Sequence, residues 1–300
     1  MQTARTFRSF FRLALLPGIA LALHACIPDP VAIEIPQAEP KLVVASQMLP
    51  GNFLLVNVSR SFGALEYAQD QSDTLSDDLL ERILADSARV VLSWPGGRDT
   101  LLGVGAGTYI GSAELIPDET YTLEVFDSLS GASVSAIASV LPPVALDSVR
   151  WRYNIRETAF GDTTFRDTLI DLIIEFTDPA GPHAYMLNAY RVRVPDSNAL
   201  TNLFNTGTGI PTIALNDRLF TSPVYRDTIT YDAFRPGDTL AVALSSISQT
   251  YYDFLTARQR SGTSIFALLL REPISFPSNI QGGYGFFNLH LPSLRLLITE

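Results

Sequence analysis

Five carboxylates between residues 162 and 178 are the side chains whose type and spacing most invite chemistry. They are Asp162, Asp167, Asp171, Glu175 and Asp178. Convergent carboxylates hold Ca²⁺, and a suitably spaced pair cleaves glycosidic bonds. Asp167 and Asp171 would share one face of a strand, so these two can cooperate. The same pattern is typical of a solvated sheet edge with acids at its turns, and we favour that interpretation over a hydrolase.

Other catalytic and metal-binding patterns are scarce. Residues 27–300 contain two histidines, His183 and His290, and no cysteine, so a zinc site built on His and Cys is not expected. The series Gly103-x-Gly105-x-Gly107 precedes a strand pattern, whereas a dinucleotide-binding turn precedes a helix. His183 follows Pro182 and is interpreted as a turn residue. We therefore predict a protein that is not an enzyme and has no metal site, no cofactor and no catalytic residues.

The first 26 residues have the layout of a secretory signal, with three arginines before an apolar run. The run, Leu13–Leu23, is shorter than the about 20 apolar residues that span a bilayer. It ends in Leu23-His24-Ala25-Cys26, which resembles the lipobox of bacterial lipoproteins, whose cysteine is acylated and becomes the mature N-terminus. We predict lipidation of Cys26, the only cysteine of the chain, rather than an ordinary signal followed by a chance cysteine.

Composition restricts the partners of the chain. The formal net charge is −10, and removal of a signal with three arginines and no acid makes it more negative. Such a surface repels nucleic acid and lacks the basic patch that binds anionic headgroups. Contact with the membrane is therefore expected through the lipid anchor. Hydrophobic residues make up 47% of the chain, which is enough for a sizeable core.

The elements of the first domain follow a proline-rich tether over residues 26–40. Short β-type runs then recur at spacings of about 8–12 residues with turn signals between them, which favours an Ig-like or fibronectin-like β-sandwich over 41–143. Ser76–Ala85 has a serine N-cap and an apolar face and is predicted to be a helix. The strand patterns of this domain cover 42–46, 52–60, 88–94, 99–104, 120–126 and 133–140.

Leu141-Pro142-Pro143 marks the start of a second β-rich domain, 144–300. A polar, glycine-containing stretch over 199–222 is predicted to be a long loop, and Ser248–Arg260 a helix. The strand patterns of this domain cover 147–153, 167–176, 185–194, 238–247 and 291–299. The predicted fold class is all-β with one or two short helices, after a lipoprotein signal over 1–25.

Aromatic side chains gather near the C-terminus, at Phe276, Tyr284, Phe286 and Phe287. Stacked rings bury a large area per contact, so Tyr284, Phe286 and Phe287 are candidate ligand-binding residues for a carbohydrate or a peptide. The alternative, which we favour, is that they close the core where the last strand returns.

Four triplets of Asp, Thr and an aliphatic residue resemble an acceptor motif for periplasmic O-glycosylation. The same triplets are also typical of a place where a turn ends in an aspartate and a strand begins. The triplets begin at Asp99, Asp167, Asp227 and Asp238.

Several segments resemble the family called domain of unknown function 4249 (DUF4249). They are Pro40-Lys41-Leu42-Val43-Val44, Asp238-Thr239-Leu240-Ala241-Val242, Ser246-Ile247-Ser248, Tyr251-Tyr252-Asp253-Phe254-Leu255, Pro277-Ser278-Asn279-Ile280 and Gly283-Tyr284-Gly285-Phe286-Phe287. The resemblance implies a lipoprotein of the outer membrane of Gram-negative bacteria, with a sandwich-like N-terminal domain and no established enzymatic activity. It also implies a TonB-dependent β-barrel receptor as a possible partner. The acidic segment with the helix near 76–85 departs from the pattern.

We therefore expect a non-catalytic outer-membrane lipoprotein that assists a TonB-dependent nutrient-uptake receptor, by capturing a ligand or by shaping the mouth of the receptor. The alternative is an adhesion or structural module of the cell envelope, and a hydrolase that uses the acidic window is third. The sequence leaves open which side of the outer membrane the body faces.

Overall fold

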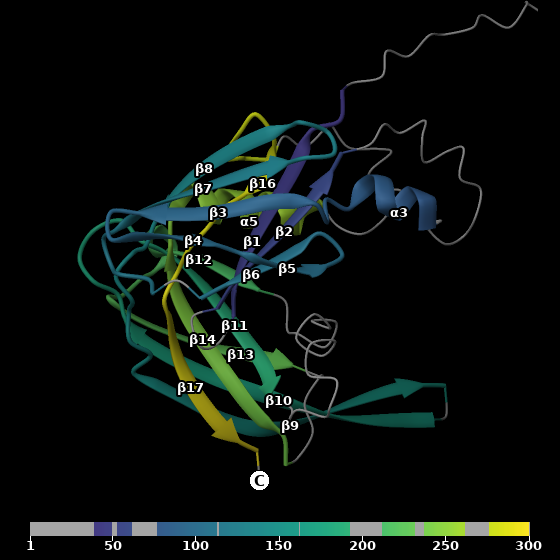
Figure 1. The fold of residues 1–300 in the computed structure, drawn as a ribbon. Helices are drawn as coiled ribbons and strands as arrows, with labels where there is room; N and C mark the ends of the chain where they lie inside the picture. The colour runs from purple at the N-terminus through teal and green to yellow at the C-terminus, as the bar shows by residue number, and fades with distance from the viewer. Residues whose placement is uncertain are drawn as a thin grey trace, which may run out of the picture. The chain divides into compact units, whose positions relative to one another are not determined.

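The computed structural model describes residues 39–49, 53–61, 77–112, 114–161, 163–192, 212–231, 237–261 and 276–299. The predicted signal peptide, Cys26, most of the tether, Ser76 and Asp162 lie outside these ranges. Strands dominate the described residues, and they form four sheets (Figure 1), so the predicted all-β class is confirmed.

The first sandwich consists of two five-stranded sheets. One has the order β16-β1-β2-β6-β5, with bounds Tyr284–Phe286, Leu42–Leu49, Phe53–Arg60, Thr108–Gly111 and Leu102–Gly105. The other has the order β15-β8-β7-β3-β4, with bounds Ile280–Gln281, Ser133–Ser139, Thr120–Asp127, Ala88–Trp94 and Gly97–Thr100.

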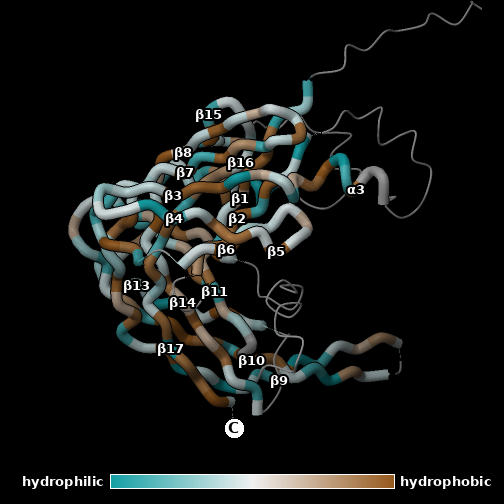
Figure 2. The backbone as a smooth tube through the Cα atoms, in the orientation of Figure 1, coloured by the Kyte–Doolittle hydropathy of each residue, from teal (hydrophilic) through white to brown (hydrophobic). Residues whose placement is uncertain are grey.

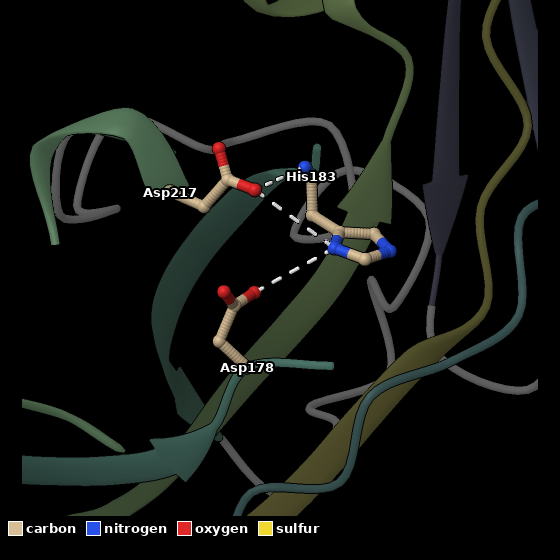
Figure 3. A group of neighbouring side chains, drawn as sticks. All are labelled: Asp178, His183 and Asp217. Atoms are coloured by element: carbon tan, nitrogen blue, oxygen red, sulfur yellow. Dashed lines mark hydrogen bonds and ion pairs between the residues drawn. The ribbon is translucent and has the colours of Figure 1, made fainter. Parts of the chain in front are cut away.

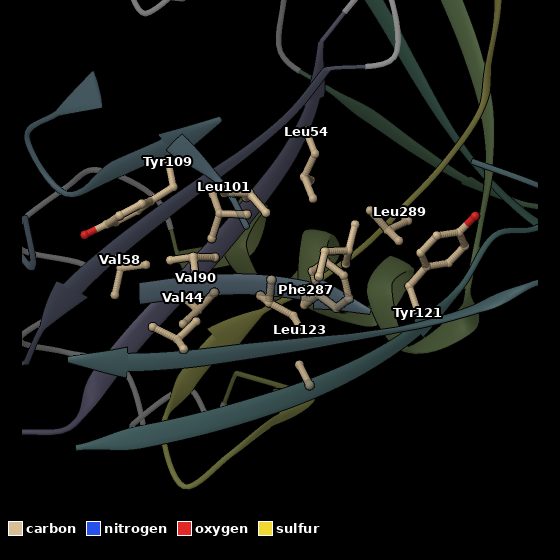
Figure 4. Close-up of a cluster of buried hydrophobic side chains, with 14 of the residues drawn as sticks. Val44, Leu54, Val58, Val90, Leu101, Tyr109, Tyr121, Leu123, Phe287 and Leu289 are labelled. Carbon is tan, nitrogen blue, oxygen red and sulfur yellow. The ribbon is translucent and has the colours of Figure 1, made fainter. Parts of the chain in front are cut away.

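Alternating side chains of these strands build one hydrophobic core. In β7, Tyr121, Leu123 and Val125 are buried while the residues between them are less so, which is the period-2 pattern of a strand with one covered face. Figure 4 shows Tyr121 and Leu123 in this core beside side chains of β1, β2 and β3. The Tyr121 hydroxyl donates to the Glu114 carbonyl at 3.0 Å and accepts from the Ile116 N–H at 3.0 Å. Such a tyrosine corner is a hallmark of immunoglobulin-type sandwiches.

The strand predicted over 99–104 is two strands in different sheets. β4 ends at Thr100 and pairs with β3, whereas β5 begins at Leu102 and pairs with β6. Leu101, between them, is 5% exposed and its N–H donates to the Val90 carbonyl at 2.9 Å. Burial of this side chain between the sheets turns the chain from one sheet to the other, which a continuous run of apolar residues does not reveal.

Residues 280–289 belong to the first sandwich, whereas the sequence suggested one uninterrupted second domain over 144–300. β15 pairs antiparallel with β8, and β16 pairs parallel with β1. Ile280, Phe287 and Leu289 lie in the first core. The Asn279 side chain donates to the Phe287 carbonyl at 2.7 Å and accepts from the Phe287 N–H at 2.8 Å, which holds the two ends of this segment together.

The second sandwich has a three-stranded sheet of order β13-β10-β9 and a four-stranded sheet of order β12-β11-β14-β17. The strands of the first of these are Val224–Tyr231, Thr163–Thr177 and Ser148–Phe160. The strands of the second are Ile213–Asn216, Ala184–Val192, Thr239–Ile247 and Pro292–Ile298. Their common core includes Phe176, Tyr185, Leu172 and Val242.

Two α-helices accompany the described strands. α3 (Asp77–Ile83) lies within the predicted helix, and α5 (Gln249–Ser261) agrees with the predicted helix to one residue at each end. The Ser248 hydroxyl accepts the Tyr251 N–H at 3.2 Å, as expected of an N-cap. The Tyr251 and Phe254 rings of α5 contact the Phe286 ring of β16, at centroid distances of 5.1 and 5.3 Å. Among the described residues, none of the helices has the length and apolar character needed to cross a membrane.

β9 and β10 form a hairpin whose pairing runs from Ser148↔Glu175 to Phe160↔Thr163. Its distal half, here called the arm (residues 154–161 and 163–168), extends away from the other strands, as Figure 1 shows. Side chains on the arm are exposed, including Ile155, Phe160 and Phe165. The sequence predicted strands only over 147–153 and 167–176, so most of the arm was not anticipated.

Candidate functional site

Asp178, His183 and Asp217 form a cluster at one end of the second sandwich (Figure 3). One nitrogen of the imidazole and one oxygen of each carboxylate all lie within 4.8 Å of one another. The three side chains are 13%, 30% and 11% exposed, respectively. The cluster is therefore mostly sheltered but open to solvent at the histidine.

A short loop holds two of the three residues. Asp178 directly follows β10, His183 directly precedes β11, and the loop between them reads Pro179-Ala180-Gly181-Pro182. Each proline fixes its own φ near −65°, and Gly181 adopts a φ of 119°, which only glycine enters readily. These restraints bring together the Asp178 carboxylate and the His183 imidazole, which are five positions apart in the sequence.

The third residue arrives through strand pairing. β12 pairs antiparallel with β11 with Ala184 opposite Asn216, so the next positions, His183 and Asp217, also face each other. The Asp217 N–H donates to the His183 carbonyl at 3.1 Å, and the His183 N–H donates to the Asp217 carboxylate. Asp217 begins the 3-10 turn η2 (Asp217–Leu219), so its position is set by the end of the ladder.

The imidazole faces the carboxylates without a hydrogen bond to them. His183 Nδ1 lies 3.8 Å from Asp178 Oδ1 and 3.9 Å from Asp217 Oδ2. Hydrogen bonds between nitrogen and oxygen have lengths of about 2.7–3.2 Å, so both separations are too long. The Nδ1 atom is nevertheless buried and has no hydrogen-bond partner among the described residues.

Tyr185 supports the cluster from inside the sandwich. Its hydroxyl donates to the Asp178 carboxylate. Burial, together with this carboxylate, raises the pKa of Tyr185 far above its usual range, so the hydroxyl keeps its proton and remains a donor. The ring is fully buried and stacks on Phe220 at 6.2 Å and 7° between planes. The cluster therefore has an apolar wall on the core side.

Asp178 is the one described acid of the window 162–178 that enters the cluster. Asp171 is 2% exposed and accepts from Thr230 Oγ1 at 2.7 Å, Arg152 Nε at 3.0 Å and Asn154 Nδ2 at 3.2 Å. These hydrogen bonds lower the pKa of Asp171, so it is a satisfied structural carboxylate. Asp167 lies 3.7 Å from Arg156 on the arm. The structure therefore does not bring Asp167 and Asp171 together as a free carboxylate pair.

The candidate ligand-binding aromatic residues are mostly core side chains. Phe287 is 0% exposed and Phe286 is 4% exposed, so neither presents a face to a ligand. Tyr284 is 49% exposed and lies under the Lys41 ammonium group at 5.3 Å. This arrangement agrees with the core-closing interpretation.

Of the Asp-Thr-aliphatic triplets, the threonines at 100, 168 and 228 are exposed.

The sequence did not reveal the cluster for three reasons. His183 has the pattern of a turn residue, which is its place in the chain, and Asp217 falls in the stretch predicted to be a long loop. The prediction of no metal site also rested on combinations of His and Cys alone. The only local signal was the run Asp-x-x-x-x-His between two strand patterns, which is too common to be specific.

Two β-sandwiches that share their C-terminal segment define the fold class of this chain. The chain belongs to the family described as "Domain of unknown function (DUF4249)", whose model matches residues 28–290. No curated protein matches it significantly in sequence. The FN1–FN3 domains of chicken CNTN1 are 9% identical with a TM-score of 0.22, over 88% of this chain and 68% of that one. The chicken interferon gamma receptor alpha chain is also 9% identical with a TM-score of 0.17, over 71% of this chain and 89% of that one.

Proposed function

We propose that the protein is a non-catalytic lipoprotein of the outer membrane that acts as an accessory partner of a TonB-dependent receptor. Membership of DUF4249 and the lipobox-like sequence before Cys26 support this proposal. Two or three acyl chains on one cysteine hold a protein at a membrane almost permanently, since each buried CH₂ contributes about 0.8 kcal/mol. The observation that carries the proposed partnership is the arm.

The arm is a two-stranded ribbon with exposed residues on both faces. Such a ribbon is at best marginally stable in water by itself, so a partner surface would stabilise it. Phe165 pairs with Thr158 and Phe160 pairs with Thr163, which places both phenylalanines on the same face as diagonal neighbours. Phe160 is 80% exposed and Phe165 is 55% exposed. Adjacent exposed aromatic residues are typical anchors of protein interfaces.

Charges on the arm occur in opposite pairs. Arg156 lies opposite Asp167, and Glu157 lies opposite Arg166 with Nε to Oε1 at 2.7 Å. Exposed ion pairs of this kind contribute little to stability, about 0–1 kcal/mol each. These two ion pairs place polar groups on the ribbon, and their four charges sum to zero. Exposed rings with a polar surround match the common composition of interfaces. Figure 2 shows the mixture of apolar and polar residues along this ribbon.

The alternative is a free-standing adhesion or structural module of the envelope, for which paired β-sandwiches are also suited. The two proposals differ in what the arm contacts. A receptor partner requires a specific β-barrel protein to remain bound after gentle extraction, whereas a free-standing module does not.

The test is co-purification of the full chain from native membranes in mild detergent. The double variant Phe160→Ser/Phe165→Ser removes the apolar face of the arm, and Leu129→Ser is the matched control, because Leu129 is 73% exposed in the β7–β8 turn. We expect a β-barrel receptor with the wild type and the control, and at least a tenfold lower recovery with the double variant. Absence of a receptor from the wild-type sample, or equal recovery with all three proteins, contradicts the proposal.

The anchor is tested separately with Cys26→Ser. The unsubstituted protein is expected in the detergent phase after phase separation, and the variant in the aqueous phase. Detergent partitioning of the variant would show that the attachment does not depend on an acylated cysteine.

A further inference from the structure

We propose that Asp178, His183 and Asp217 bind a divalent transition-metal ion, for which Zn²⁺ is the best match. This site lies apart from the arm and does not depend on the proposed receptor partnership. The ligand atoms are His183 Nδ1, Asp178 Oδ1 and Asp217 Oδ2, the three atoms that face one another in Figure 3.

The spacing of the ligand atoms is that of a metal site slightly expanded. Zinc binds imidazole nitrogen at about 2.0–2.1 Å and carboxylate oxygen at about 2.0–2.2 Å, so tetrahedral angles place the two atoms about 3.4 Å apart. The measured separations are 3.8 and 3.9 Å. Each nitrogen–oxygen pair therefore needs to approach by about 0.5 Å, and the two carboxylate oxygens, which lie within 4.8 Å of each other, need to come together as well, which side-chain rotations can provide.

An ion pair between a protonated imidazole and the two carboxylates explains the geometry less well. A charged N–H would close to hydrogen-bonding distance with at least one oxygen. Instead, Nδ1 is buried, points between the two carboxylates and donates to neither. A buried nitrogen without a partner is costly, and a metal ion at this position satisfies it.

The chemistry of the three donors selects the ion. Two carboxylates supply a formal charge that balances a divalent cation, and the imidazole favours zinc and its neighbours over Ca²⁺ or Mg²⁺, which prefer oxygen ligands throughout. Three protein ligands leave a fourth position of a tetrahedron open. Water is the expected fourth ligand of a site with three protein ligands.

Hydrogen bonds already orient both carboxylates. Tyr185 donates to the Asp178 oxygen that faces the imidazole, and the His183 N–H donates to the Asp217 oxygen that faces it. Supporting contacts of this kind fix ligand orientation, and their loss typically weakens metal affinity by about 10–100-fold. The sheltered, partly apolar surroundings strengthen the attraction between the ion and the carboxylates.

The experiment measures Zn²⁺ binding to the purified full chain in detergent, by titration calorimetry and by metal content after dialysis. The variants are His183→Asn, Asp217→Asn and Tyr185→Phe, and Asp167→Asn is the matched control on the arm. We expect one Zn²⁺ per wild-type or control chain. We expect at least about 100-fold weaker binding after loss of a ligand, and about 10–100-fold weaker binding with Tyr185→Phe. Substitution with Co²⁺ should give the intense visible absorption of a four-coordinate site.

Far-UV circular dichroism of each variant establishes that it is folded. If the ligand variants do not fold, Tyr185→Phe and the Co²⁺ spectrum of the wild type decide the question. Absence of Zn²⁺ from the wild type, equal binding by Asp217→Asn, or several ions bound with similar affinity per chain would each overturn the proposal.

Discussion

Replacing Asp127 by asparagine is expected to destabilise the first sandwich by about 3–5 kcal/mol, the usual cost of removing one partner of a buried ion pair. The Asp127 side chain is 0% exposed and that of Arg60 is 10% exposed. The guanidinium group donates to both carboxylate oxygens, from Nε at 2.7 Å and from a terminal nitrogen at 2.8 Å. Asparagine has nearly the same shape but no charge, so it leaves the arginine without an anion.

Arg60 cannot relieve this penalty by turning toward solvent without further loss. Its other terminal nitrogen donates to the Leu84 carbonyl at 2.8 Å and to the Arg82 carbonyl at 3.2 Å, so the arginine also joins β2 to the end of α3. The guanidinium group holds the pKa of Asp127 well below its usual range. The stabilisation by this pair is therefore complete at neutral pH, and it is lost as the pH falls below the ordinary pKa of aspartate.

The assay is urea unfolding followed by tryptophan fluorescence. Trp94 packs against the first core and Trp151 against the second, so a Trp151→Phe background reports on the first sandwich. With a slope of about 1–3 kcal/mol per molar urea, Asp127→Asn should lower the midpoint by at least about 1 M.

The control for this prediction is Glu124→Gln, which removes an exposed ion pair with Arg98 at 3.7 Å. It should change stability by less than about 0.5 kcal/mol. The double variant Arg60→Met/Asp127→Leu should recover part of the loss, because apolar side chains often replace a buried ion pair without cost, whereas the Leu84 carbonyl and the Ser130 hydroxyl lose their partners. Equal midpoints for Asp127→Asn and Glu124→Gln would refute the reasoning.

Three further predictions concern single positions. Burial lowers the pKa of His290 from 6.5 to about 4, so the unfolded chain binds the extra proton first and stability falls as the pH drops from 6.5 to 4. The free energy of unfolding should fall by about 3 kcal/mol in total over this range. Unfolding at several pH values should show that it depends less steeply on pH in His290→Leu. Gly285→Ala should destabilise β16 and the first sandwich by more than about 2 kcal/mol, because its Cβ would lie 2.0 Å from the Val44 carbonyl oxygen at a φ of 100°. A normal melting temperature for this variant would contradict the pairing of β16 with β1. Tyr121→Phe should cost about 0.5–1.5 kcal/mol through loss of the hydrogen bond to the Glu114 carbonyl, and an unchanged urea midpoint would contradict that role.

Local patterns in the sequence were sufficient where alternation and turn residues coincide. The strand predicted over 88–94 has the bounds observed for β3, and Pro95 and Gly96 end it. The helix α5 was predicted from its serine cap and its basic last turn. In these segments the residues that determine the element lie within it, so no information from distant parts of the chain is needed.

Features that depend on distant partners were not predictable in this way. The arm carries exposed residues on both faces, so it lacks the alternation that marks a strand over a core. β12 is four residues long, and its place beside β11 follows from pairing across the sheet. The contact of Asp217 with His183 depends on that register, and a shift of one residue would separate them. The cluster therefore appears only when the complete sheet is known.

The parallel pairing of β16 with β1 has a consequence for biosynthesis. β1 starts at Leu42 and β16 starts at Tyr284, so the outer backbone groups of β1 have no strand to meet until the ribosome has made nearly the whole chain. Contacts so distant in sequence form slowly, and an unpaired strand edge in the meantime invites aggregation. The nascent polypeptide is therefore expected to need a chaperone for most of its synthesis.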